Sequence, residues 1–259
     1  MSRNAGQLVK EFIGYFQELA YRHSPWNVWA DFCEISAIGA SNVVDRIHAD
    51  QREETYMKII SKYTNEETNL FPKMLAIVVL ELTRDPKQDF LGKLYMELNL
   101  NDEGKAQIFT PYSMSEAMAR LCCEGVTIDK LQIEELKATV ARKGYVTIHD
   151  PTCGAGSTLI GARNALQEAG IGTSQSYFVG QDLSSTAVYM CYIQLSLLGC
   201  AGYLCIGDSL LNPTGMYGLL PAKLEGQDIW ILPATFLDPV WAGRIHWRQM
   251  MLAINRTAK

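Results

Sequence analysis

The chain has 259 residues, of which 48% are apolar, 20% charged and 10% aromatic. This composition is typical of a globular protein and excludes collagen-like, low-complexity and disordered chains. The 23 basic and 28 acidic residues give a net charge of −5, which argues against general, sequence-independent binding to nucleic acid. The longest apolar run, residues 74–80, is far shorter than the roughly 20 residues of a membrane-spanning helix, so we expect no contact with a membrane.

The N-terminus and the cysteines both indicate a cytoplasmic protein. The first residues, Met1-Ser2-Arg3-Asn4, carry one charge and no apolar stretch follows them, so no secretory signal is recognised. The seven cysteines are odd in number and no two have C-x-x-C spacing, which argues against a disulfide framework or a zinc site. We therefore expect free thiols, no bound metal and a cytoplasmic location.

The first hundred residues have the spacing of amphipathic helices. Apolar side chains recur every three or four positions, which gathers them on one face of a helix. One such series is Leu8, Phe12, Phe16 and Leu19, and a second is Val43, Ile47, Met57 and Ile60. We predict a helical N-terminal domain over residues 1–105.

Two more helices are expected after a polar connector at 101–110. Thr110 and Pro111 suit the cap and the first position of one of them, and the other covers 129–143. The first would continue through Met114, Met118 and Leu121.

From residue 145 onward, short β-rich runs alternate with helical segments. The expected strands are 145–148, 177–179, 203–206 and 228–232, and the expected helices are 157–169 and 186–198. Such alternation predicts a parallel sheet with right-handed crossovers. The fold class is therefore α/β, with a Rossmann-like domain over 106–259 preceded by the helical region.

The most informative motif is Asp150-Pro151-Thr152-Cys153-Gly154-Ala155-Gly156, between an expected strand and an expected helix. Glycines there let the backbone turn tightly and come close to a ligand. The following helix offers N–H groups and a positive dipole end to an anionic group such as a carboxylate. Leu159 replaces the third glycine of G-x-G-x-x-G, and no G-x-x-x-x-G-K-[ST] is present, which disfavours dinucleotide and triphosphate cofactors.

Carboxylates also follow the next two expected strands. Asp182 can accept two hydrogen bonds from ribose hydroxyls. Its separation in sequence from the glycine turn is about that expected for a βαβ unit. Asp208, followed by Ser209, can accept a hydrogen bond from an adenine amino group. The three strand ends would then face one crevice, where open α/β sheets bind ligands.

Together these motifs resemble the S-adenosylmethionine-dependent adenine-N6 DNA methyltransferases, above all the modification subunits of type I restriction systems. Residues 150–156 match the Asp-Pro-x-Cys-Gly-x-Gly cofactor motif, and Phe109-Thr110-Pro111 matches the [FY]-T-P motif that precedes it. Gly180-Gln181-Asp182-Leu183 also matches the family pattern. The similarity covers residues 86–212 well and the rest loosely.

The resemblance implies a site for S-adenosylmethionine. The Asp150 turn would hold the methionine part, Asp182 the ribose, and Asp208 with Ser209 the adenine. The cofactor-binding residues so implied are Phe109, Thr110, Pro111, Asp150, Pro151, Thr152, Gly154, Ala155, Gly156, Asp182, Leu183, Asp208 and Ser209.

The catalytic motif of that family, [NDS]-P-P-[YFW] after the fourth strand, has no intact copy here. In the family, its first residue accepts a hydrogen bond from the target amino group and its aromatic residue stacks on a flipped base. Pro233-Ala234-Thr235-Phe236 has the expected position but keeps only the aromatic residue. Asp238-Pro239-Val240-Trp241 keeps the acceptor, one proline and the aromatic residue. We therefore predict Asp238, Pro239 and Trp241 as catalytic.

The sheet is expected to be truncated, because only 18 residues follow Trp241. An open parallel sheet ending there has an unpaired edge, which the N-terminal helices, a protein partner or a second copy of the chain would cover. DNA containing the target adenine is the other partner that the resemblance implies.

Each signal also has a purely structural interpretation. The glycines can simply shape a tight turn, Asp182 and Asp208 can cap a helix or turn, and Asp238 with Pro239 can open a helix.

The leading hypothesis is an S-adenosylmethionine-binding adenine-N6 DNA methyltransferase, which needs no metal because the sulfonium already activates the methyl group. The alternative is a catalytically inactive relative that acts as a cofactor-sensing or interaction subunit of a restriction-modification or anti-restriction system. A third possibility is an empty pocket in a purely structural protein.

Overall fold

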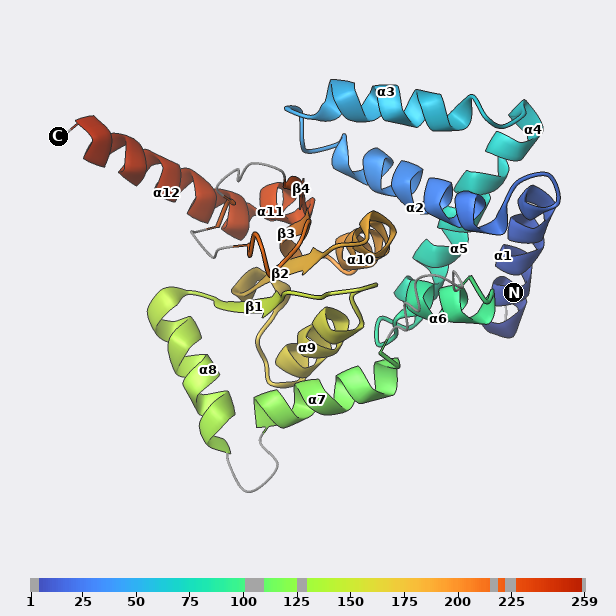
Figure 1. The fold of residues 1–259 in the computed structure, drawn as a ribbon. Helices are drawn as coiled ribbons and strands as arrows, with labels where there is room; N and C mark the ends of the chain where they lie inside the picture. Colours follow the sequence, from blue (N-terminus) through green and yellow to red (C-terminus); the bar gives the residue numbers. More distant parts are fainter. Residues whose placement is uncertain (1–4, 101–109, 125–129, 215–218, 222–226, 258–259) are drawn as a thin grey trace.

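The computed structural model describes residues 5–100, 110–124, 130–214, 219–221 and 227–257 (Figure 1). The N-terminal helices are α1 Ala5–Ala20, α2 Pro25–Ser41, α3 Ala49–Ile60, α4 Asn65–Thr68, α5 Leu70–Arg84 and α6 Phe90–Glu97. These helices precede and flank the sheet, as the sequence predicts.

The first apolar series behaves as predicted, and the second does not. Leu8, Phe12, Phe16 and Leu19 are all buried along α1. Val43 and Ile47 lie between α2 and α3 and are 60% and 88% exposed, and Met57 is also exposed. The buried side chains of α3 are instead Arg52 and Ile59. The second series crosses the break between α2 and α3, so its spacing did not identify the buried face of α3.

The remaining helices largely coincide with the predicted ones. They are α7 Tyr112–Glu124, α8 Lys130–Lys143, α9 Ser157–Glu168, α10 Ser185–Leu197, α11 Ala234–Leu237 and α12 Pro239–Thr257, with a 3₁₀ turn at Thr173–Gln175. Although α7 is a helix, its Met114, Met118 and Leu121 are exposed. Its inward face carries Ser115 and Ala119.

The sheet has four strands in the order β1-β2-β3-β4. They are β1 Val146–Asp150, β2 Ser176–Asp182, β3 Ala201–Ile206 and β4 Asp228–Ile231. The first three are parallel and adjacent, with Asp150 opposite Gly180 and Asp182 opposite Ile206. The carboxyl ends of β1, β2 and β3 therefore meet at one edge of the sheet, which we call the carboxyl edge.

The fourth strand corrects the prediction of an all-parallel sheet. β4 runs antiparallel to β3, with Ile206 opposite Asp228 and Tyr203 opposite Ile231. A parallel neighbour needs a long crossover, usually a helix, whereas an antiparallel neighbour needs only a loop. The described part of the connection between β3 and β4 contains no helix. As a result, β4 ends at the edge where β1, β2 and β3 begin, which we call the amino edge.

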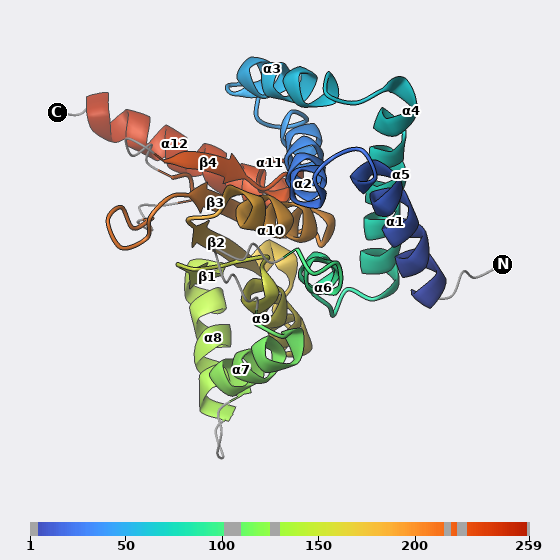
Figure 2. The same ribbon diagram turned by 45° about the vertical axis from the view of Figure 1, so that its right-hand side comes forward.

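Alternate residues of the strands pack into two different cores. Phe178, Leu204 and Trp230 belong to a cluster that also contains buried residues of α1, α2, α5, α6 and α10. Tyr177 and Tyr203 face the opposite side and pack with Trp241 and Ile245 of α12. α10 thus lies between the sheet and α2 (Figures 1 and 2).

The helical region and the sheet share the first of these cores. The predicted boundary between residues 105 and 106 falls within 101–109, outside the described residues, and stays a prediction. Within the described ranges, no helix is both long and apolar enough to span a bilayer.

Candidate cofactor-binding site

The turn after β1 has the geometry that its glycines predict. Gly154 and Gly156 have φ values of +53° and +97°, a region that disfavours other residues. A Cβ atom at Gly156 would lie 2.8 Å from the Cys191 sulfur, so the turn packs directly on α10. Asp150 stabilises the turn by accepting hydrogen bonds from the Thr152 N–H, at 2.9 Å, and from the Thr158 hydroxyl. Pro151 and Thr152 are exposed, and Ala155 is buried.

Asp182 joins the ends of β1 and β2. Its Oδ2 accepts a hydrogen bond from the Gly154 N–H at 2.9 Å, and its Oδ1 accepts one from Ser184 N–H at 2.9 Å. A carboxylate has about four acceptor positions, so two remain available for ribose hydroxyls. The side chain is only half-buried, and the neighbouring Leu183 is exposed. The structure therefore brings together the Gly154 turn and Asp182, two predicted parts of one site.

Asp208 has the local role that the structural interpretation predicted. Its Oδ1 accepts hydrogen bonds from the N–H groups of Leu210, at 2.8 Å, and Leu211, at 3.1 Å. Both contacts hold the turn after β3. Asp208 and Ser209 nevertheless lie next to the carboxyl end of β3, on the same edge as Asp182.

Gln181, which the sequence analysis named in a motif but gave no role, holds the loop that follows β3. Its side chain is fully buried, and its Oε1 accepts hydrogen bonds from both the N–H and the hydroxyl of Thr214, each at 2.7 Å. Its Nε2 donates to the Asn212 carbonyl at 2.9 Å. The end of β2 thereby anchors the segment that follows Asp208.

The start of α7 lies beside the turn formed by residues 150–156, the predicted cofactor turn. The hydroxyl groups of Ser115 and Ser157 are hydrogen-bonded at 2.9 Å, and Ser157 is the first residue of α9. A Cβ atom at Gly161 would lie 2.9 Å from the Ser115 carbonyl oxygen, so α7 and α9 are in close contact. Thr110 and Pro111 are exposed one turn before Ser115, whereas Phe109 lies outside the described residues.

Gln194 supports the same turn from α10, and the sequence analysis did not identify this residue. This buried amide on α10 donates to the Ala155 carbonyl at 2.9 Å and to Asp89 Oδ1 at 2.8 Å. Its oxygen accepts a hydrogen bond from the Leu91 N–H at 3.1 Å. Burial raises the pKa of Asp89, against the effect of the hydrogen bonds from Gln194 and the Gly92 N–H. A single amide within the otherwise apolar run of residues 187–195 was the available signal in the sequence.

A comparison with protein families adds an independent observation. Residues 86–229 match the family described as N-6 DNA Methylase, and this range is more than half of the chain. The chain belongs to the N-6 DNA Methylase family. The matched range contains the Asp150 turn, Asp182 and Asp208, and it ends before Pro233 and Asp238.

Two solved structures also match this chain. One is a protein assigned to the class I S-adenosylmethionine-dependent methyltransferases of Listeria monocytogenes, with 16% identity, a TM-score of 0.40, and coverage of 80% of this chain and 54% of that chain. The other is the methyltransferase subunit of a type I restriction-modification system from Streptococcus thermophilus, with 18% identity, a TM-score of 0.41, and coverage of 76% and 42%. The chain thus spans about half of the length of these two proteins. A comparison with curated proteins found no match.

The predicted catalytic residues lie at the amino edge of the sheet. Asp238 Oδ2 accepts a hydrogen bond from the Ser174 hydroxyl at 2.7 Å, and Ser174 precedes β2. A strand rises about 3.3 Å per residue, so the two ends of β2 lie about 20 Å apart. Asp238 is therefore far from Asp182, and the structure does not assemble the two into one site.

Pro239 and Trp241 are likewise away from the carboxyl edge. Pro239 is the first residue of α12, and Asp238 caps this helix through the N–H groups of Val240 and Trp241. Trp241 is fully buried, and its ring lies 5.0 Å from that of Tyr177. In this structure the indole is not exposed for stacking on a flipped base, and the assignment of Asp238, Pro239 and Trp241 as catalytic stays a prediction.

The second candidate loop lies at the same amino edge. Thr235 of the Pro233-Ala234-Thr235-Phe236 segment is fully buried and is hydrogen-bonded to both the N–H and the carbonyl of Gly202, near the start of β3. Both candidate loops lie at the amino edge for the same reason. Because β4 is antiparallel to β3, the chain leaves β4 at that edge.

The described cysteines are consistent with the expectation of free thiols. Cys33, Cys153, Cys191, Cys200 and Cys205 are all buried and unpaired. Burial raises the pKa of the Cys191 thiol, which lies against the cofactor turn. In the part of the chain that the structure describes, no group of three or more His, Cys, Asp or Glu side chains is arranged to hold a metal ion.

Proposed function

We propose that this N-6 DNA methylase binds S-adenosylmethionine at the carboxyl edge of β1, β2 and β3. The observation that carries the proposal is the hydrogen bond from the Gly154 N–H to Asp182. This bond holds the glycine turn next to a carboxylate that has acceptor positions left for a ligand. The donor and acceptor groups fit the cofactor, since the first turn of α9 leaves N–H groups unpaired for its carboxylate. S-adenosylmethionine, when bound, supplies an activated methyl group without a metal.

Each element of the edge would then hold one part of the cofactor. The turn from Asp150 to Gly156 would hold the methionine part, and Asp182 would accept hydrogen bonds from the ribose. Asp208 and Ser209, at the end of β3, would face the adenine. Thr110 and Pro111 would border the pocket from the start of α7, which contacts the turn through Ser115.

The geometry favours a cofactor-binding or interaction subunit over a self-sufficient adenine-N6 methyltransferase. Transfer requires an acceptor for the amino hydrogen and a stacking surface beside the methyl group. Among the described residues, both candidate loops lie at the amino edge instead. We therefore propose that methyl transfer to adenine in DNA, the activity implied by the family, needs groups from another polypeptide.

The outer edge of β1 is the place where such a polypeptide would attach. Within the described ranges, β1 pairs with β2 on one side and with no strand on the other. Its His149 is exposed. An unpaired strand edge is a template for another chain, and a strand added here parallel to β1 would end beside the Asp150 turn. We propose a protein partner, or a second copy of this chain, at this edge.

Two measurements test these proposals separately. Calorimetric titration with S-adenosylmethionine and S-adenosylhomocysteine should show saturable binding at micromolar affinity or tighter. Incubation of the same protein with labelled S-adenosylmethionine and adenine-containing duplex DNA should transfer no methyl group. Absence of binding to either compound would reject the cofactor site, whereas methyl transfer by the chain alone would reject the need for a second polypeptide.

A further inference from the structure

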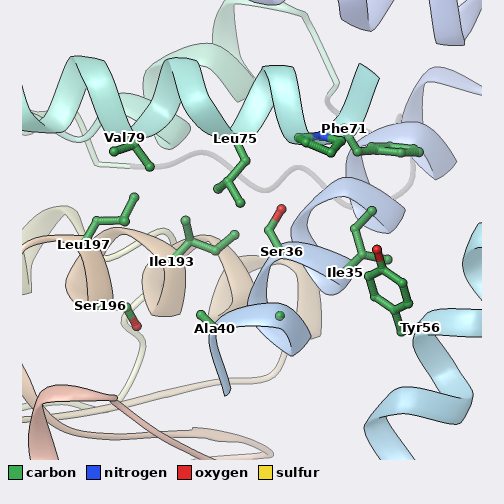
Figure 3. A pocket seen from close by; sticks show the side chains of 12 residues that line it. Ile35, Ser36, Ala40, Tyr56, Phe71, Leu75, Val79, Ile193, Ser196 and Leu197 are labelled. Carbon is green, nitrogen blue, oxygen red and sulfur yellow. The ribbon is translucent and has the colours of Figure 1, made fainter. Parts of the chain in front are cut away.

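A cavity of about 310 Å³ lies on the side of α10 that faces away from the sheet (Figure 3). Its walls come from α2, α3, α5 and α10. It is separate from the carboxyl edge, and no residue of the proposed cofactor site lines it.

The cavity is partly open to solvent and is large enough to hold a small molecule. Protein interiors are close-packed, with few voids larger than a water molecule, and one water occupies about 30 Å³ of liquid. The space between these helices is several times larger. Gly39 of α2 is an exposed lining residue, and a Cβ atom added there would meet no atom within 4 Å. Pockets that bind small molecules begin at about 300 Å³.

The residues that line the cavity favour a neutral and mostly apolar ligand. Leu75 of α5 and Ile193 of α10 point toward one another across the space (Figure 3). Val79 and Leu197, which also line it, are 38% and 41% exposed, so the cavity opens at this end. None of the lining residues carries a charge at neutral pH, and a charged ligand would lose its hydration without a partner.

The hydroxyl-bearing residues of the lining are Ser36, Tyr56 and Ser196. The Ser36 hydroxyl, on α2, points across the space toward α5 (Figure 3). Apolar pockets commonly combine a hydrophobic lining with a few polar groups that fix orientation. We propose that the cavity binds a neutral, mostly apolar small molecule, with one hydrogen-bonding group at Ser36.

The cavity lies behind the helix that supports the cofactor turn. Ile193 and Ser196 of its wall flank Gln194, which donates to the Ala155 carbonyl at 2.9 Å. A ligand in the cavity would therefore contact the element that holds the turn in place. Binding in the cavity does not depend on the cofactor proposal, and the experiment below contains no S-adenosylmethionine.

The test is a fluorescence titration with N-phenyl-1-naphthylamine, a neutral probe of the proposed class. The wild-type protein should bind it saturably, with one probe per chain, and should unfold at a higher temperature in its presence. Gly39→Leu adds a large side chain at an exposed lining position, and leucine also favours the helix over glycine. This variant should stay folded and bind the probe at least about tenfold more weakly, a loss of about 1.4 kcal/mol.

Gly14→Leu is the matched control. Gly14 is exposed on α1, and a Cβ atom there also meets nothing within 4 Å. This variant should bind the probe like the wild type. Ala40→Leu, at a second lining position, repeats the test if Gly39→Leu does not give a cooperative thermal transition. No saturable binding by the wild type, or unchanged binding by a folded cavity-filling variant, would overturn the proposal.

Discussion

The two edges of the sheet contain the same local motif in different surroundings. At the carboxyl edge, Asp150 precedes a proline and accepts a hydrogen bond from the N–H two residues ahead, at 2.9 Å. At the amino edge, Asp238 also precedes a proline and accepts the same kind of bond, at 2.8 Å. The first turn leads into left-handed glycines beside Asp182, whereas the second leads into a buried tryptophan. Strand direction, and not the motif alone, decides which turn can reach a ligand.

The amino edge is built as a packed core. The ring of Trp241 contacts those of Tyr145, at 5.3 Å, and Tyr177, at 5.0 Å. The Arg244 guanidinium lies 4.4 Å above the same indole and donates to the carbonyls of Gly144 and Ser174. These contacts fasten α12 to the start of β1 and β2.

The largest expected effect comes from removing the buried indole. Trp241→Ala should lower the free energy of unfolding by about 3–5 kcal/mol, as for other large-to-alanine changes in cores. Trp247→Ala, on the same helix but 62% exposed, should change it by less than about 0.5 kcal/mol. Urea denaturation measures both. Equal stability of the two variants would show that Trp241 is not a core residue and would reopen its assignment as a stacking residue.

A glycine at the amino edge should show the next largest effect. Gly202 has a φ of +150°, and a Cβ atom there would lie 1.8 Å from the Phe178 carbonyl oxygen. Gly202→Ala should cost about 3 kcal/mol through overpacking and backbone strain. Gly199→Ala is the control, because Gly199 also has a positive φ, +70°, but an open Cβ position. It should cost only about 1 kcal/mol. Similar thermal denaturation of the two variants would contradict the packing of β3 against β2.

The smallest effect is a pH dependence at Asp238. Although burial alone raises the pKa of this carboxyl, hydrogen bonds from Ser174 and from the N–H groups of Val240 and Trp241 hold the pKa below its ordinary value. A lowered folded-state pKa stabilises the protein above the unfolded-state value of about 3.9, and this contribution disappears as the pH falls through the folded-state pKa. The stability difference between the wild type and Asp238→Asn should therefore shrink between about pH 5 and pH 2. A difference independent of pH, measured by urea denaturation, would show that Asp238 is not held as a carboxylate.

Much of the carboxyl edge could be predicted because its signals are local and its strands are consecutive. The expected strands at 177–179 and 203–206 fall within β2 and β3. Consecutive parallel strands place their following loops side by side, and this brings Gly154 to Asp182. Glycines with positive φ were also accessible from the sequence, since a tight turn into a helix requires them.

The direction of β4 could not be predicted from its four residues. A short apolar run has no intrinsic direction, and contacts from distant parts of the chain fix it. Arg52 of α3 donates to the Ile229 carbonyl at 2.9 Å and lies 4.0 Å above the Trp230 ring. The same arginine is held by Asp45 at 2.8 Å. Because these partners are far apart in the sequence, spacing within the α/β region gave no sign that β4 reverses.

The measurement that tests the account most directly compares the affinity for S-adenosylmethionine of two matched variants, Asp182→Ala and Asp238→Ala. Asp182→Ala removes the acceptor for the Gly154 N–H and for the ribose, so the affinity should fall at least about tenfold. Asp238→Ala removes a helix cap, so it should lower the free energy of unfolding by about 1 kcal/mol and leave the affinity unchanged. The opposite pattern in calorimetric titration, with binding lost in Asp238→Ala and retained in Asp182→Ala, would place the cofactor at the amino edge and contradict the account.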